Sequence, residues 1–364
     1  MEKNNRFRLN RAIFSLLIFI CCLFVGALLV VASSVILPFT IAVLLTFVMY
    51  PMVRWLDKKR VHRFLSIFLV VSILVAALFL FGFILFTSGS NIVAAYPRYE
   101  YRIVEIYLWV AQFFDLSFDE SLTIWENLWG QLGVRNFIRD FAVSFSTISI
   151  NFISSAVLVI LFIVFILLEV SFFKEKLEAA FAKRSDNIQQ IAYDSMVQVS
   201  RYLTAKFFIS LVTGLIIGVG LSIIGLEFAV LWGVLQFFLN FIPMLGSIAA
   251  GVGMTSLALV QFWPDPLPVV WVVILILATN TVIGSFLDPR IVGNHVGISP
   301  LMVLVSLSIW GWIWGFVGMI LAVPMVVIIK IVCENVPILK PVSILLGTQK
   351  NVEAKKAERQ EGSG

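Results

Sequence analysis

Charged side chains are scarce in this chain of 364 residues. Asp, Glu, Lys and Arg together make up 13% of it, whereas about a quarter of the residues of an ordinary soluble domain are charged. Hydrophobic residues make up 60%. No water-soluble fold of this length can bury so much apolar surface, so the composition excludes a soluble protein and indicates an integral membrane protein.

Residue types that carry chemistry are also scarce. The chain has two histidines and three cysteines, and Cys21, Cys22 and Cys333 lie in or beside apolar runs. This arrangement predicts neither a disulfide framework nor a metal site. No glycine-rich nucleotide loop and no catalytic triad pattern is found. The sequence therefore argues against an enzyme and an ATP-driven pump, and we expect no cofactor.

What the chain has instead is a series of apolar runs separated by short basic clusters. A helix of about 20 apolar residues spans a bilayer. Six runs have this length, at residues 12–32, 35–53, 64–88, 146–170, 207–226 and 269–287. The formal net charge of +5 comes from basic loops between such runs, which is typical of membrane topology and not of a nucleic-acid groove.

The basic loops also predict the orientation, because cytoplasmic loops carry an excess of Lys and Arg. Such an excess precedes the first run and recurs in residues 54–63 and 171–206. Residues 89–145 are more acidic and show amphipathic patterns, which predict helices at the outer interface. The stripe in residues 171–206 predicts a cytoplasmic helix, either on the membrane or packed under the bundle. Both termini are expected in the cytoplasm.

Two further apolar runs, at residues 228–260 and 300–334, are long for one crossing and short for two. Asn240–Ser247 breaks the first run, and three glycines interrupt the second. The basic residues after these runs fall on the cytoplasmic side only if each run ends on the side of the membrane where it began. This favours runs that turn back, although two full crossings per run would place the loops on the same sides. Each would then form a hairpin that follows a full span. The two units would have opposite orientations, as in the inverted repeats of secondary transporters.

The expected fold is therefore an all-α polytopic membrane protein. It has about six full spans plus two broken or re-entrant helical hairpins, arranged as an inverted repeat. The expected divisions are N-terminal spans at 1–88, extracytoplasmic helices at 89–145, a fourth span with a cytoplasmic helix at 146–206, a transport unit at 207–345 and a polar cytoplasmic tail at 346–364.

The polar groups at membrane depth are neutral, and the carboxylates lie near span ends, so the sequence favours a neutral, hydroxyl-rich ligand over a bare ion. The residues expected along the pathway are Gln236, Asn240, Pro243, Gly246, Ser247, Thr279, Asn280 and Thr281. Two alternatives stay open here. The break is a plain proline kink, or the polar groups only join helix to helix.

A second set of residues is expected to form a turn or gate. Its members are Asp288, Pro289, Arg290, Gly293, Asn294, Gly311, Gly315 and Gly318. Arg290 alternatively marks only the cytoplasmic boundary. Gly214 with Gly218, and Gly311 with Gly315, have the spacing of close helix contacts. These contacts lie within one chain or in the homo-oligomer that we expect.

Several motifs follow one another in a recognisable order. They are Arg201-Tyr202-Leu203, Asn240–Ser247, Asp288–Gly293, Gly297–Leu301, Trp310-Gly311-Trp312 and Ala322-Val323-Pro324. Together they resemble the autoinducer-2 exporter family of bacterial permeases. The resemblance implies export of a small signalling molecule, or a related metabolite, across the bacterial inner membrane, with the lipid bilayer and a small solute as partners. It equally admits a sodium/proton antiporter, and a scaffold without flux is a third hypothesis.

Overall fold

The computed structural model describes residues 23–113, 155–170, 185–287, 297–336 and 339–347, with a few positions between residues 13 and 21. Every regular element in this part of the chain is a helix. The elements are a helix at residues 23–31, α2 (Ser33–Lys58), α3 (Arg63–Phe113), a helix at Ser155–Val170, α6 (Ser185–Ile224), α7 (Ala229–Leu239), α8 (Leu245–Phe262), α9 (Leu267–Thr279), the π-helix η2 (Asn280–Leu287), α11 (Pro300–Asn335) and α12 (Lys340–Leu346).

The predicted all-α polytopic fold is confirmed. Six stretches of the described helices are long and apolar enough to cross a bilayer, namely Ser33–Lys58, Arg63–Ile92, Tyr193–Ile224, Leu245–Phe262, Leu267–Leu287 and Pro300–Asn335. Their outward faces carry large exposed apolar side chains, such as Phe79 and Ile223. Lipid is the solvent in which such faces are stable, because no water-facing helix of a soluble protein exposes so many of them.

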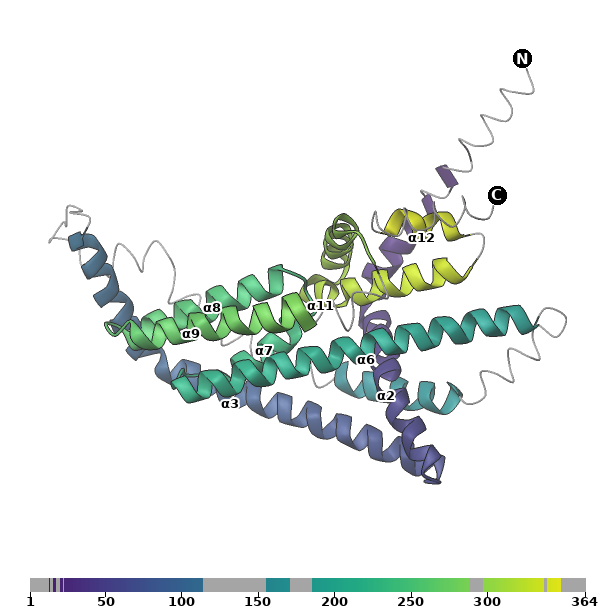
Figure 1. Cartoon of the computed structure of the whole chain (residues 1–364), viewed down its shortest axis with the longest axis horizontal. Helices are drawn as coiled ribbons and strands as arrows, with labels where there is room; N and C mark the ends of the chain where they lie inside the picture. Colours follow the sequence, from purple (N-terminus) through teal and green to yellow (C-terminus); the bar gives the residue numbers. More distant parts are fainter. Residues whose placement is uncertain are drawn as a thin grey trace, which may run out of the picture.

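Helix α6 is the central element of the molecule (Figure 1). Its 40 residues extend about 60 Å at 1.5 Å per residue, twice the thickness of a hydrocarbon core. The expected cytoplasmic helix and fifth span are thus one continuous helix. Before the middle of α6, Val199, Tyr202 and Leu203 are buried in one cluster with side chains of α2 and α11. This part of the amphipathic stretch therefore packs against the bundle.

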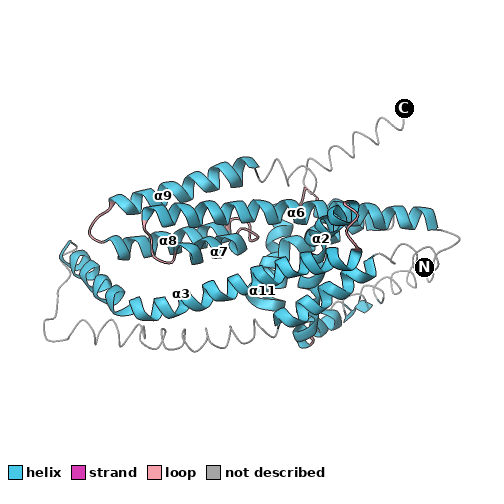
Figure 2. Cartoon of the chain, turned by 90° about the horizontal axis from the view of Figure 1, so that it is seen from below, coloured by secondary structure: helices cyan, strands magenta, loops and turns pink. Residues whose placement is uncertain are grey.

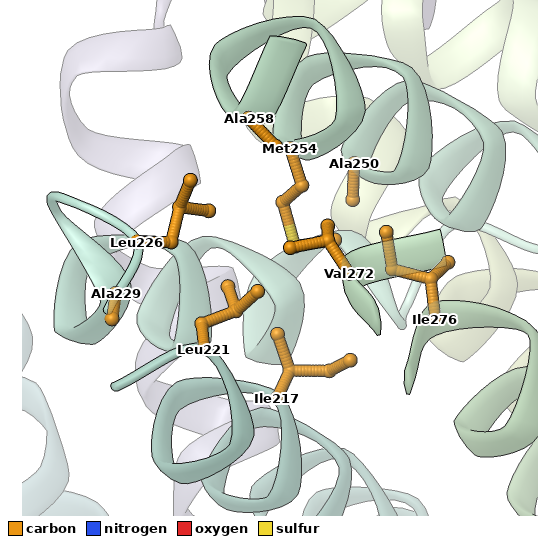
Figure 3. Packing of buried hydrophobic residues seen from close by; sticks show 9 residues of the cluster. All are labelled: Ile217, Leu221, Leu226, Ala229, Ala250, Met254, Ala258, Val272 and Ile276. Carbon is orange, nitrogen blue, oxygen red and sulfur yellow. The ribbon is translucent and has the colours of Figure 1, made fainter. Parts of the chain in front are cut away.

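The far half of α6 packs against α7 and α9, and α8 packs against both of these helices (Figures 1 and 2). Figure 3 shows the apolar core between them, with the Met254 side chain of α8 pointing toward Leu221 of α6 and Val272 of α9. Nine buried side chains from these elements form one cluster, so α6, α7, α8 and α9 behave as one packed body. Burying one of the larger side chains, such as Leu221 or Met254, contributes about 1.5–3 kcal/mol when the reference is water. Inside lipid, packing contacts between the helices replace that contribution.

The N-terminal spans form a second packed body. Side chains of α2, α3 and the helix Ser155–Val170 share a buried cluster that includes Ala42, Val70 and Ile163. Arg63 at the start of α3 joins these helices, because its guanidinium donates to Leu167 O at 3.1 Å and to Asp57 Oδ2 at 3.3 Å. The carbonyls at a helix end have no intrahelical partner, so this cation satisfies one of them.

Two joints differ from the sequence expectation. The break expected near Ser33 and Ser34 is a kink at Ala32, across which helical hydrogen bonds run from Ala32 N to Leu28 O and from Ile36 N to Ala32 O. Helix α3 continues through residues 93–113, where separate interfacial helices were expected, and residues 114–154 lie outside the described part. A helix needs no break at the bilayer surface, because its backbone stays hydrogen-bonded in water as well.

Candidate functional site

The first broken run forms a hairpin, which we call the first hairpin (α7, residues 240–244 and α8). Helix α7 has 11 residues, or about 16 Å, which is half of a hydrocarbon core. The ring of Trp232 in α7 lies against Gly253 in α8, so closely that a Cβ on Gly253 would approach it to 2.4 Å. The two arms are therefore side by side, and the chain reverses at the break. The backbone is therefore not that of a plain proline kink, while the expected role of the break in solute binding stays a prediction.

The second broken run also folds back, inside α11, and we call it the second hairpin. Trp314 and Gly315 have non-helical backbone angles, and Gly315 has φ 61° and ψ −141°. The Ser306 hydroxyl donates to Ala322 O at 2.7 Å. In a straight helix these two residues would be about 24 Å apart. The hydrogen bond is therefore possible only because the two arms of α11 lie against each other.

The two hairpins share one construction detail near their tips. A Cβ on Gly246 would come within 1.8 Å of Leu239 O, and a Cβ on Gly318 would come within 1.9 Å of Trp310 O. In each hairpin a glycine lets one arm approach a backbone carbonyl of the other arm. Two such matched contacts, each following a long helix, fit the expected repeat of span and hairpin.

The tip of the first hairpin packs against the arms of the second. Ile242, at the first tip, is buried in one cluster with Leu307 and Ala322, one from each arm of the second hairpin. Met244 closes the first tip with a positive φ of 61°, and Gly246 N donates to Ile242 O at 3.1 Å. Non-helical backbone at membrane depth must be satisfied by the protein itself or by an aqueous cavity. Here the arms of the second hairpin cover Ile242, whereas the neighbouring Met244 is exposed.

Beside the first hairpin lies a group of neutral polar side chains, Ser210 and Thr213 from α6 with Gln236 and Asn240 from α7, which we call the polar quartet. The Asn240 amide donates to Ser210 Oγ at 3.0 Å. The other two are almost fully buried, at 2% exposure each. Spacings of three and four residues place each pair on one face of its helix. The quartet thus forms a polar patch at the α6–α7 contact.

One atom of the polar quartet has no partner. Gln236 Oε1 is buried and accepts no hydrogen bond from the described residues. Leaving a buried polar atom unpaired costs about 1–3 kcal/mol. Native proteins keep few such atoms, and those they keep often face a water or a ligand. The carboxamide oxygen therefore marks a point where a solute hydroxyl would gain a hydrogen bond.

Close glycine packing holds α6 and α7 together at the polar quartet. Gly233 of α7 lies against Gly214 and Gly218 of α6, and a Cβ on Gly233 would come within 2.7 Å of Gly214 O. This pair of α6 glycines therefore serves packing within the chain. Aromatic rings flank the same contact, with Phe237 on Phe207 at 5.4 Å between centroids. These contacts fix the polar quartet on two well-packed helices.

The other expected half of the pathway lies at the end of α9. Thr279 is buried, Asn280 is half-buried and Thr281 is exposed. Asn280 begins η2, a π-helical stretch of eight residues. Such segments are rare in proteins as a whole, and those that occur often lie at functional sites. In the described part of the chain, no hydrogen bond joins Asn280 to the polar quartet. The expected place of Asn280 in the pathway stays a prediction.

The remaining expected residues are divided between the hairpins and a segment outside the described residues. In the first hairpin, Pro243 is exposed and Ser247 is half-buried. In the second, Gly311 lies against Met319 of the same chain. The expected turn or gate residues Asp288, Pro289, Arg290, Gly293 and Asn294 all lie outside the described residues.

Sequence reasoning missed Ser210 and Thr213, which are 0% and 2% exposed. A signal for them existed, because they are polar residues three positions apart in an otherwise apolar run. Their partners on α7 could not be read from the sequence, since a hydroxyl on a spanning helix bonds its own backbone as readily as another helix. Thr213 does this, donating to Ile209 O at 2.7 Å.

Comparison with known proteins gives a consistent family. A family model described as AI-2E family transporter matches residues 13–338. A candidate transport protein of Borreliella burgdorferi is 32% identical over 331 residues, covering 91% of this chain and 89% of that protein. The AI-2 transport protein TqsA of Escherichia coli is 30% identical, covering 86% of this chain and 90% of TqsA. The match thus extends over nearly the whole of each protein, and the chain belongs to the AI-2E family of transporters.

Proposed function

We propose that this chain is a secondary transporter that exports a small neutral polar solute, such as AI-2, across the bacterial inner membrane. The observation that carries the proposal is the polar quartet, which lies beside a hairpin that reverses inside the apolar region. Broken helices at membrane depth form the solute sites of many secondary transporters. TqsA is named as an AI-2 transport protein, and this supports the choice of solute.

The chemistry of the quartet supports a neutral solute. Helices α7, α8 and α9 and the π-helix η2 contain no Asp, Glu, Lys or Arg, and the buried ionisable residue one turn before Ser210 on α6 is a cation, Lys206, not a carboxylate. A bare cation or a proton-coupled site needs a carboxylate inside the membrane. Hydroxyl and amide groups instead exchange hydrogen bonds with solute hydroxyls, each as donor and acceptor. Gln236 Oε1 can accept one such bond without breaking any bond that it already makes.

The packing supports a pathway that passes between the two hairpins. The first tip touches the arms of the second hairpin through Ile242, Leu307 and Ala322, and Gln236 and Asn240 of the polar quartet lie on the arm that leads to the first tip. A solute that leaves the quartet toward the second hairpin requires these apolar contacts to separate. This contact thus acts as the closed barrier, and transport requires the hairpins to move relative to each other.

The experiment is AI-2 uptake into inverted membrane vesicles, whose outer face is the cytoplasmic face of the protein. We expect uptake with the unaltered chain and a loss of at least tenfold with Gln236→Leu, which keeps the size but removes the amide. Equal uptake by both proteins at equal expression would contradict the assigned site. Exchange of sodium for protons across the vesicle membrane, without AI-2 uptake, would instead support the antiporter hypothesis. The absence of any flux would support the scaffold hypothesis.

A further inference from the structure

A cavity of about 590 Å³ lies on the other side of the first hairpin from its tip, between α3 and the start of α7. We call it the outer cavity. Its lining residues from α3 are Ile84, Thr87, Ser88, Asn91, Ala95 and Arg98, and those from the second wall are Glu227 to Leu231. The α3 residues recur every three or four positions, so they form one helix face. This volume lies in the usual range of small-molecule sites.

The lining combines a larger apolar part with a few polar groups and has no net charge. Thr87, Ser88 and Asn91 contribute two hydroxyls and an amide, at the outer end of the apolar stretch of α3. The charged side chains at the cavity are Arg98 and Glu227, which pair with each other at 2.6 Å. A cation or an anion would have to compete with this pair, whereas a neutral solute with hydroxyl groups would not.

The wall opposite α3 is fixed by a network around Glu227. Its carboxylate accepts hydrogen bonds from Arg98 and from the Tyr99 hydroxyl, while its backbone N–H donates to Gln261 Oε1 of α8 at 2.7 Å. Burial and the nearby Glu227 carboxylate raise the pKa of the Tyr99 phenol above its usual value, so the phenol keeps its proton and remains a donor. The two walls of the cavity are thus held at a defined spacing.

We propose that the outer cavity is a second binding site for the exported neutral polar solute, which the solute occupies on the face opposite the basic loops before release. This inference rests on the proposed function, because it takes the same solute. It adds a site of its own, on α3 and the α6–α7 connection, with Thr87, Ser88 and Asn91 as the contacting side chains.

The first test is protection from a membrane-impermeant thiol reagent in right-side-out vesicles. The matched pair is Ser88→Cys, in the cavity, and Ser90→Cys, which is exposed and does not line it. Both are made in a chain with Cys21→Ser, Cys22→Ser and Cys333→Ala. We expect AI-2 to slow labelling of the Ser88→Cys variant at least threefold and to leave the Ser90→Cys variant unchanged. Equal labelling rates with and without AI-2 at both positions would overturn the proposal.

A second test separates the two proposals. For Asn91→Leu we expect the half-saturating AI-2 concentration to rise at least fivefold when AI-2 is supplied to right-side-out vesicles, and to stay within twofold in inverted vesicles. If the half-saturating concentration rises equally in both kinds of vesicle, or in neither, the outer site is overturned. The proposed function still holds in that case if the unaltered chain takes up AI-2 into inverted vesicles. If the unaltered chain takes up no AI-2, the proposed function is contradicted, and protection from labelling still tests binding at the outer cavity.

Discussion

At the scale of single residues, the polar quartet is where structural and transport roles have to be told apart. The bond from the Asn240 amide to Ser210 Oγ joins α6 to α7, and such bonds inside membranes are worth about 0.6 kcal/mol each. A residue that serves packing alone would therefore have a small effect on stability and a proportionate effect on transport. A residue that contacts the solute would lower transport far more than it lowers stability.

The substitution Ser210→Ala tests this difference. We expect thermal stability in detergent to fall by about 0.6 kcal/mol, and AI-2 uptake to fall at least fivefold, because Asn240 loses the partner that orients its amide. The control is Ser222→Ala on the same helix, an exposed serine that bonds Gly218 O of its own helix at 2.7 Å. Uptake that falls no further in Ser210→Ala than in the control would assign Ser210 to packing only.

At the scale of helices, both hairpins depend on a glycine that meets a carbonyl of the opposite arm. We expect Gly246→Ala and Gly318→Ala each to destabilise the protein by roughly 1–3 kcal/mol, since the added methyl forces the arms apart. Uptake should be lost in both. Gly82→Ala is the matched control, because nothing lies within 4 Å of its Cβ position. Normal melting and uptake in either hairpin variant would show that its arms are less tightly apposed than the structure has them.

The sequence predicted the hairpins better than it predicted the helices. Proline, glycine and polar residues inside an apolar run have no role in a plain spanning helix, so Asn240–Ser247 and the α11 glycines marked the reversals correctly. The lengths of α3 and α6 were not predicted, because the third span was ended at residue 88 and the fifth was begun at residue 207, where the apolar runs stop. A helix can continue into water, and only tertiary contacts decide whether it does.

Two of the four residues of the polar quartet were among those named from the sequence. Gln236 and Asn240 were identified as polar residues in an apolar run, and the structure places both at the α6–α7 contact. Which helix faces them was not predictable, since residue order along the chain does not define the rotation of one helix against another. The outer cavity was missed for the same reason. Thr87, Ser88 and Asn91 form a polar face only once Glu227 and the start of α7 lie opposite them.

At the scale of the whole molecule, a hydrogen bond joins the helix at residues 23–31 to the second hairpin. The Trp314 indole N–H donates to Leu29 O at 3.1 Å. Leu29 lies one turn before the kink at Ala32, and Trp314 lies at the reversal of α11. The hydrogen bond therefore connects the kinked N-terminal helix to the reversal of the second hairpin, which we propose moves during transport.

Replacing Trp314 by Phe removes this donor and keeps an aromatic ring. We expect Trp314→Phe to cost about 1 kcal/mol of stability, the usual net value of one hydrogen bond, and to change the maximal rate of AI-2 uptake more than the half-saturating concentration, because no quartet residue is altered. Melting curves and uptake kinetics measure the two effects. A change confined to the half-saturating concentration would place Trp314 in the solute site instead.

The central claim is that the tip of the first hairpin packs against an arm of the second and must separate from it during transport. A chain without native cysteines that carries Ile242→Cys and Leu307→Cys, treated with a short bifunctional thiol reagent, tests it directly. The account predicts efficient cross-linking, loss of AI-2 uptake, and recovery of uptake when a cleavable cross-link is reduced. The control pair, Ile248→Cys with Leu307→Cys, uses a position exposed on α8 and should not cross-link. Full uptake by a fully cross-linked protein would contradict the account.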